Sequence, residues 1–262
     1  AFTGNKFEFR AVGSSANSSN AMLVLNTIVA NQLKEFTKEV DALIAKDLKK
    51  DEAILQVLQQ YIVHSKKIRF EGNGYGDEWR EEAHKRGLSN VTTTPPALDA
   101  YVTEKSKKLF HDNNIFSHRE LEARHEILLE TYMKKIQIES RVMGTLVLNH
   151  IVPCAVKYQT ELIRNVEGLK GLGLKDEHYR IQMELIKEIS EHVAIIKTKV
   201  DEMVDERKKA NKIEHAREKA IAYCDKVRPH FDEIRYHVDK LELIVEDSSW
   251  PLPKYREMLS AR

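Results

Sequence analysis

Between Asp176 and Val245 the sequence carries two long runs in which apolar residues recur every three or four positions. The first run has its apolar residues at Ile181, Leu185, Ile189, Val193, Ile196, Val200 and Met203. The second run has them at Ile213, Ala216, Ala220, Tyr223, Val227, Ile234, Val238, Leu241 and Val245. Such spacing places the apolar side chains in one stripe along a helix, close to a coiled-coil seam. Because only a short polar turn separates the runs, we predict an antiparallel helical hairpin.

The same periodicity predicts helices in most of the remaining chain. They cover residues 20–46, 51–68, 79–86, 94–110 and 117–169. The longest is expected to begin at a capping box formed by Ser117 and Glu120 and to bend at Pro153, which lacks a backbone N–H. The predicted fold class is therefore mainly α: a bundle of long helices that contains the antiparallel hairpin and follows one short N-terminal β-strand.

The first two predicted helices each carry an apolar stripe that we expect to face inward. The stripe of the first helix includes Leu25, Ile28, Leu33, Phe36 and Val40. The stripe of the second helix includes Ile54, Leu55, Leu58, Tyr61 and Ile62. Stripes of this kind bury one face of each helix against a neighbour.

The amino-acid composition limits which kinds of partner and which cellular compartment we expect for this chain. The chain is 42% apolar and 32% charged, with only 10 Gly and 6 Pro, as in proteins built from long amphipathic helices. Lys and Arg (42) nearly balance Asp and Glu (41), so neither a nucleic-acid nor a membrane-surface partner is favoured. No apolar run approaches the roughly 20 residues that cross a bilayer. Cys154 and Cys224 lie within helical patterns, as small core residues do in a reducing compartment, and we expect a cytoplasmic protein.

The first ten residues contain a strict two-residue alternation that predicts a β-strand. Phe7 and Phe9 would lie on one face, and Lys6, Glu8 and Arg10 on the other, with neighbouring side chains roughly 6.5–7 Å apart. A carboxylate placed there could hold a divalent metal ion, and the two cations could hold phosphate or carboxylate oxygens. From the spacing alone, a solvated charged face is the simpler interpretation.

Residues 2–17 resemble the last active-site strand and the following loop of glutamine synthetases. In that superfamily a basic residue precedes an apolar-Glu-apolar-Arg pattern, and an Ala-Asn pair soon afterwards opens a helix. The matching residues here are Glu8, Arg10, Ala16 and Asn17. The resemblance to type III enzymes extends over nearly the whole chain, through Gly72–Trp79, Arg86–Asn90, Lys135–Arg141 and Trp250–Pro253.

This resemblance implies roles for three residues. Glu8 would be a ligand of the Mg²⁺ or Mn²⁺ ion that bridges the phosphates of ATP, and Arg10 would bind the carboxylate of the substrate glutamate and stabilise phosphoryl transfer. Lys6 would lie near the nucleotide phosphates, where many family members have an arginine; lysine offers a point charge in place of a planar fork. The implied reaction transfers the γ-phosphoryl group of ATP to glutamate, and ammonia then displaces phosphate to give glutamine.

The resemblance also implies a domain organisation. Residues 1–46 would be the last piece of the catalytic domain, and residues 47–262 a helical C-terminal domain. The chain starts at Ala1 directly before the predicted strand, so we expect it to be the tail of a longer polypeptide. The other metal ligands of the family precede this strand, and the chain alone should therefore make no glutamine. Ring-shaped homo-oligomers are a further implication.

Other interpretations rest on periodicity and short motifs. A non-enzymatic helical interaction or oligomerisation module, built on the hairpin, would also explain the long apolar stripes. Two Glu-x-x-His pairs, Glu81 with His84 and Glu122 with His125, invite comparison with carboxylate-bridged di-metal bundles. Surface histidines are the simpler interpretation, because such sites need ligands from four facing helices.

The glycine-rich segment around Tyr75 lacks the Gly-Lys-Ser/Thr ending of a phosphate-binding loop and does not follow a predicted strand. We interpret it as structural. A role in contacts between subunits is the alternative, with Tyr75 and Trp79 exposed for that purpose.

Overall fold

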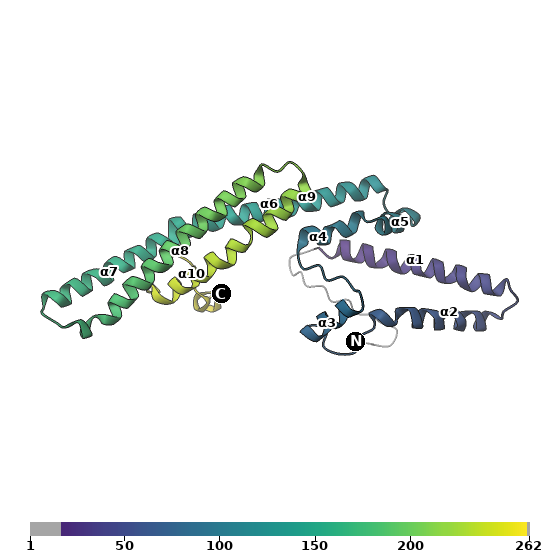
Figure 1. Cartoon of the computed structure of the whole chain (residues 1–262), viewed down its shortest axis with the longest axis horizontal. Helices are drawn as coiled ribbons and strands as arrows, with labels where there is room; N and C mark the ends of the chain where they lie inside the picture. The colour runs from purple at the N-terminus through teal and green to yellow at the C-terminus, as the bar shows by residue number, and fades with distance from the viewer. Residues whose placement is uncertain (1–16, 261–262) are drawn as a thin grey trace. The chain divides into compact units, whose positions relative to one another are not determined.

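The computed structural model describes residues 17–260, without the side chains of Tyr255, Arg256 and Ser260. These residues are helical almost throughout, as Figure 1 shows, which confirms the mainly α prediction. The strand predicted within the first ten residues lies outside the described part of the chain and stays a prediction. Among residues 17–260, no helix combines the length and apolarity that a membrane span requires.

Eleven α-helices are described, with shorter 3₁₀ and π segments between some of them. The α-helices are α1 (Ser19–Ile44), α2 (Lys50–His64), α3 (Asp77–Lys85), α4 (Thr94–Leu98), α5 (Glu104–Asp112), α6 (His118–Leu146), α7 (Val152–Gly171), α8 (Arg180–Asn211), α9 (Ala216–Ala222), α10 (Pro229–Ile244) and α11 (Tyr255–Ser260). The 3₁₀ segments are η1 (Ser65–Ile68), η2 (Asp99–Val102) and η4 (Asp176–His178), and the π segments are η3 (Val147–Ile151) and η5 (Tyr223–Val227).

The chain divides into two compact units. The first extends to Val91 and includes Ala100–Glu122. The second contains Thr92–Asp99 and the chain from Ala123 onward. The helices α1 and α2 form most of the first unit, and α7, α8 and α10 form the body of the second.

In the first unit, α1 and α2 pack side by side around a small core (Figure 1). Val40, Ala53 and Val57 are buried there, and the rings of Phe36 and Tyr61 meet edge to face with centroids 6.0 Å apart. Phe36, Val40 and Tyr61 belong to the predicted stripes, whereas Ala53 and Val57, the buried residues of α2, were not predicted to face inward.

Several apolar residues that we expected to face inward are exposed. Leu33 is 60% exposed, Leu55 58% and Ile62 56%. The prediction is wrong for these residues because each helix carries more apolar surface than one partner helix can cover. Two helices of this unit bury one narrow stripe against each other and leave a second apolar stripe uncovered.

The helix predicted over residues 94–110 is divided into α4, η2 and α5. The division occurs at Thr103, whose Oγ1 accepts a hydrogen bond of 3.2 Å from the backbone N–H of Ser106. A threonine side chain in this position caps the start of a new helix instead of continuing the preceding one. The predicted capping box is confirmed at the start of α6, where Ser117 and Glu120 exchange side-chain to backbone bonds of 2.8 and 3.3 Å.

The second unit contains the predicted hairpin. Along α8, Ile189, Ile196, Val200 and Met203 are almost completely buried, as the seam pattern predicts. They share one core with residues of the returning segment, which include Tyr223, Val227, Ile234, Leu241 and Val245. The helices α8 and α10 pack along each other, and α7 lies against α8 as well. His192 faces His237 and Lys199 pairs with Glu233, so α8 and α10 run antiparallel, as predicted.

Pro153 and Pro229 of the second unit each follow a π segment. The π segment η3 ends shortly before Pro153, and η5 ends shortly before Pro229. In η5 the N–H of Arg228 donates to the carbonyl of Tyr223, five residues earlier, over 3.0 Å. Proline cannot donate the usual helical hydrogen bond, so the regular backbone ladder is interrupted at these positions. The bend predicted at Pro153 stays a prediction, and a π segment precedes this proline in the structure.

Candidate functional site

Lys6, Glu8 and Arg10, the residues predicted to bind nucleotide, metal and substrate, lie outside the described residues. Their geometry stays a prediction. Among the described residues, Asp99 of the second unit is bound by both a histidine and an arginine side chain.

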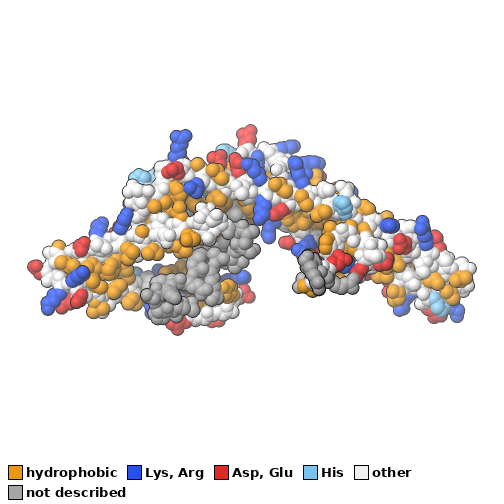
Figure 2. Space-filling view, turned by 180° about the vertical axis from the view of Figure 1, so that it is seen from behind, with side chains coloured by type: hydrophobic (Ala, Val, Ile, Leu, Met, Phe, Trp, Pro, Cys, Tyr) orange, Lys and Arg blue, Asp and Glu red, His pale blue; other side chains and the backbone are white. Residues whose placement is uncertain are grey.

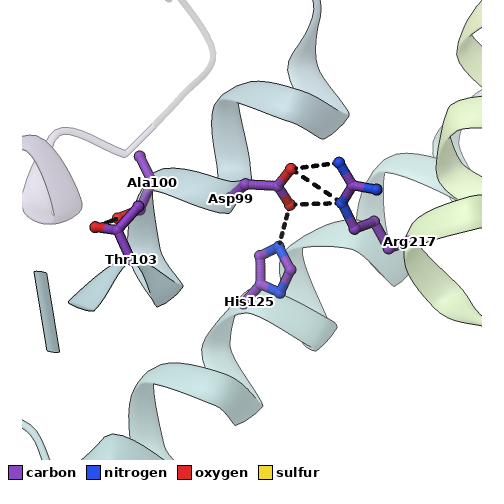
Figure 3. Close-up of polar contacts among 5 residues, drawn as sticks. All are labelled: Asp99, Ala100, Thr103, His125 and Arg217. Carbon is purple, nitrogen blue, oxygen red and sulfur yellow. Dashed lines mark hydrogen bonds and ion pairs between the residues drawn. The ribbon is translucent and has the colours of Figure 1, made fainter.

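Asp99 begins η2, directly after α4, and its carboxylate is bound from two other elements (Figure 3). Arg217 of α9 donates from Nε to both carboxylate oxygens, at 3.0 and 2.9 Å, and from Nη2 to Oδ2 at 2.7 Å. His125 of α6 places its Nε2 3.1 Å from Oδ1. An ionised carboxylate only accepts hydrogen bonds, so the imidazole donates here.

The cluster keeps Asp99 ionised. The hydrogen bonds from Arg217 lower the pKa of the Asp99 carboxyl, and the bond from His125 acts in the same direction. Burial opposes this effect, since the Asp99 side chain is only 29% exposed. In return, the Asp99 carboxylate raises the pKa of Arg217. Two-point binding of a carboxylate by a guanidinium is stronger and more directional than a single contact.

This arrangement ties Asp99, directly after α4, to His125 of α6 and Arg217 of α9, and it contains no nucleophile. Thr103, the nearest hydroxyl drawn in Figure 3, donates to the carbonyl of Ala100 over 3.2 Å and not to the Asp99 cluster. We therefore interpret the cluster as structural. The local sequence pattern does not predict this cluster, because Asp99 and Arg217 are far apart in the chain.

The two members of the Glu122 and His125 pair have different partners. Glu122 receives a bond of 2.9 Å from Lys107, whereas His125 binds Asp99. The two side chains therefore do not converge on one point. Across the described residues, no three His, Cys, Asp or Glu side chains are grouped so as to hold a metal ion.

The glycine-rich loop of the first unit is held by an aromatic stack. The rings of Phe70 and Trp79 lie 4.3 Å apart, and the guanidinium of Arg86 lies 5.9 and 5.7 Å from their centres. Arg86 also donates to the carbonyl of Arg69 over 2.7 Å. Gly72 packs so closely on Phe70 that a Cβ there would come within 2.8 Å of the ring.

These contacts support the structural interpretation of the loop. Trp79 is half-buried in the stack, and not exposed as the alternative of a subunit contact supposed; that alternative itself stays untested. Tyr75 is 81% exposed, as expected. The turn that carries it is closed by Asn73, whose side-chain oxygen accepts from the Tyr75 N–H over 3.1 Å.

Among the described residues, α1 and α2 carry an uncovered apolar stripe that includes Leu33, Leu55 and Ile62. Figure 2 shows apolar side chains at the surface of this unit, on the left of the view. Beside Leu58 and Ile62 a hollow of about 560 Å³ opens, which Gln32, Tyr61, His64 and Ser65 also line. Exposed apolar surface of this kind is typical of regions that contact another protein, a membrane or a ligand.

A match to a protein family indicates the class of protein to which this chain is similar. Residues 53–170 match the family described as the glutamine synthetase C-terminal domain. This segment includes α3 to α6, most of α2 and nearly all of α7, and therefore parts of both units.

Whole-chain similarity then points to particular enzymes. The chain is 49% identical over 263 residues to the glutamine synthetase of Bacteroides fragilis and 36% identical over 268 residues to the type-3 glutamine synthetase of Dictyostelium discoideum. These matches cover 99% and 100% of this chain. The chain is thus similar over its whole length to glutamine synthetases, a type-3 enzyme among them. It spans 36% of the length of each of these relatives.

Proposed function

We propose that this chain is the C-terminal part of a type III glutamine synthetase. The complete enzyme would join ammonia to L-glutamate with ATP, through a γ-glutamyl phosphate. The observation that carries the proposal is the similarity of 99% of this chain to the Bacteroides fragilis glutamine synthetase at 49% identity. Residues 1–46 would complete the catalytic domain, and residues 47–262 would form the helical C-terminal domain.

Three side chains of the N-terminal segment would take part in catalysis. Glu8 would be a ligand of Mg²⁺ or Mn²⁺, Arg10 would bind the substrate carboxylate, and Lys6 would bind ATP phosphates. A divalent ion supplies positive charge that stabilises the transferring phosphoryl group. The support for these roles is the match of Glu8, Arg10, Ala16 and Asn17 to the family pattern.

The uncovered apolar stripe of α1 and α2 supports a chain that acts as part of a larger protein. Leu33, Leu55 and Ile62 would be exposed to water in a free-standing module. Because the relatives are much longer than this chain, the remainder of a synthetase offers the surface that would cover the stripe. Assembly into a ring-shaped homo-oligomer would be a further way to cover it.

A comparison of two proteins tests the proposal. The full-length polypeptide that contains this chain and the 262-residue chain alone are each assayed for glutamine formation from glutamate, ammonia and ATP with Mg²⁺ or Mn²⁺. We expect activity from the full-length protein only, since most of the length of the relatives lies outside this chain. Glutamine synthesis by the chain alone would contradict the assignment of the missing active-site residues.

The alternative function is a non-enzymatic helical interaction or oligomerisation module. The hairpin of α8 and α10 favours this alternative, because long, regularly packed helices often form the contacts between subunits. A full-length polypeptide that forms stable oligomers but neither cleaves ATP nor forms glutamine would support this alternative.

A further inference from the structure

Two histidines face each other across the hairpin of the second unit. His192 of α8 and His237 of α10 place their Nδ1 atoms 2.8 Å apart, and their ring centres lie 5.1 Å apart. The His192 side chain is 14% exposed, so the pair lies at the edge of the packed seam and an ion from solvent can reach it. The buried residues Ile196, Ile234 and Leu241 hold α8 and α10 together on either side of the pair.

The distance between the two Nδ1 atoms defines the chemistry of the pair. One Nδ1 must carry a hydrogen and donate it, and the other must present a lone pair. Two N–H groups, or two lone pairs, would repel each other at 2.8 Å. The two rings therefore point toward one shared position, which in the protein as described holds a single proton.

A carboxylate favours one tautomer of His192. Glu188 lies one helical turn earlier on α8, and its Oε1 is 3.6 Å from Nε2 of His192. A carboxylate on this side stabilises a hydrogen on Nε2 and leaves Nδ1 free to accept, as in the outer shell of metal-bound histidines. Glu233, one turn before His237 on α10, is bound instead to Lys199 over 2.9 Å.

We propose that His192 and His237 bind one divalent transition-metal ion of the zinc or copper type through their Nδ1 atoms. The ion takes the position of the shared proton. His237 needs only to move its hydrogen from Nδ1 to Nε2, so both rings bind as neutral imidazoles and no proton is released. Because no third ligand-type side chain joins the pair among residues 17–260, water completes the coordination.

The geometry and the chemical class of the ion follow from the ligands. Imidazole nitrogen suits Zn²⁺, Cu²⁺ and Ni²⁺, whereas Mg²⁺ and Mn²⁺ prefer oxygen ligands. Tetrahedral zinc with Zn–N bonds of about 2.0–2.1 Å separates its two nitrogens by about 3.3 Å. The rings must therefore part slightly, which side-chain rotation allows. This site is distinct from the Mg²⁺ or Mn²⁺ site proposed at Glu8.

Zinc uptake by the chelator-treated 262-residue chain tests the proposal. We expect one Zn²⁺ per chain by equilibrium dialysis, and loss of that ion in both H192N and H237N. Asparagine keeps a hydrogen-bonding group close to the position of Nδ1, so the helices stay paired. The matched control is H150N, which changes an exposed histidine of η3 and should leave zinc uptake unchanged.

Two further readouts separate a built site from general zinc affinity. Free Zn²⁺ at 100 times its dissociation constant should stabilise the wild-type chain by about 2.7 kcal/mol and leave H192N unchanged. The Nδ1 resonances of both rings should shift together on zinc addition in nitrogen NMR. Equal zinc uptake by wild type and both variants, or no uptake by any of them, would overturn the proposal and leave a pair that shares only a proton. Neither result bears on glutamine synthesis.

Discussion

Arg217 of α9 binds both carboxylate oxygens of Asp99, a residue that precedes it by 118 positions. Asp99, which directly follows α4, is bound in this way to α9 and, through His125, to α6. Because the carboxylate is largely withdrawn from water and has two partners, its removal should loosen this part of the second unit.

The substitution D99N tests this role. We expect a loss of about 1–2 kcal/mol in the free energy of unfolding, because the charged hydrogen bonds are lost while the amide still fits. Urea titration followed by circular dichroism measures it. D112N removes an exposed carboxylate that pairs with Lys108 and should have little effect. An equal loss in both variants would contradict a special role for Asp99.

The stabilisation by Asp99 should depend on pH. Its pKa is lower in the folded than in the unfolded chain, so the unfolded state binds more protons as the pH falls. The contribution is therefore complete above the unfolded value of about 3.9 and is lost as the pH falls through the lower folded value. The urea midpoints of wild type and D99N should differ at pH 6 and converge in acid. A difference that stays constant down to pH 3 would rule this mechanism out.

Tyr223 carries a buried hydroxyl in the second unit. It is almost completely buried, and its hydroxyl donates to Oδ1 of Asn211 over 2.7 Å. Y223F should cost about 1 kcal/mol in unfolding free energy, because Asn211 keeps a second donor, Gln137, at 3.1 Å. Y236F, at an exposed tyrosine of α10, is the control and should leave the urea midpoint unchanged.

The uncovered stripe of α1 and α2 should cause self-association of the chain alone. Replacing the exposed Leu55 and Ile62 by glutamine should reduce association in sedimentation velocity and reduce the binding of a hydrophobic dye. Stability should change little, since neither side chain is buried. V57A, on the buried face of α2, should instead lower stability by about 1–2 kcal/mol without reducing association. Unchanged association in the glutamine variant would argue against a docking role for the stripe.

The helices and the hairpin could be predicted because their signals are local. The spacing from Ile189 to Met203 identifies the buried face of α8, and Ser117 with Glu120 identifies the start of α6. Periodicity identifies an apolar face but not the surface that covers it. This is why the prediction that Leu33 faces inward is wrong.

Contacts between residues far apart in the chain have no local sequence pattern from which they could be predicted. Nothing around Asp99 indicates a partner at Arg217, and the facing of His192 and His237 depends on the register of α8 against α10. The predicted catalytic residues rest on a different kind of evidence. Periodicity suggests only a charged strand face, and the roles of Glu8 and Arg10 come from resemblance to the glutamine synthetases.

The most direct test of the account is the metal dependence of glutamine formation by the full-length polypeptide with Glu8 replaced by glutamine. The control is E78Q, which changes an exposed glutamate of α3. If Glu8 holds the divalent ion, E8Q should lower kcat by at least about 100-fold and raise the Mn²⁺ concentration for half-maximal activity, whereas E78Q should match the wild type. Wild-type activity and wild-type metal dependence in E8Q would contradict the account.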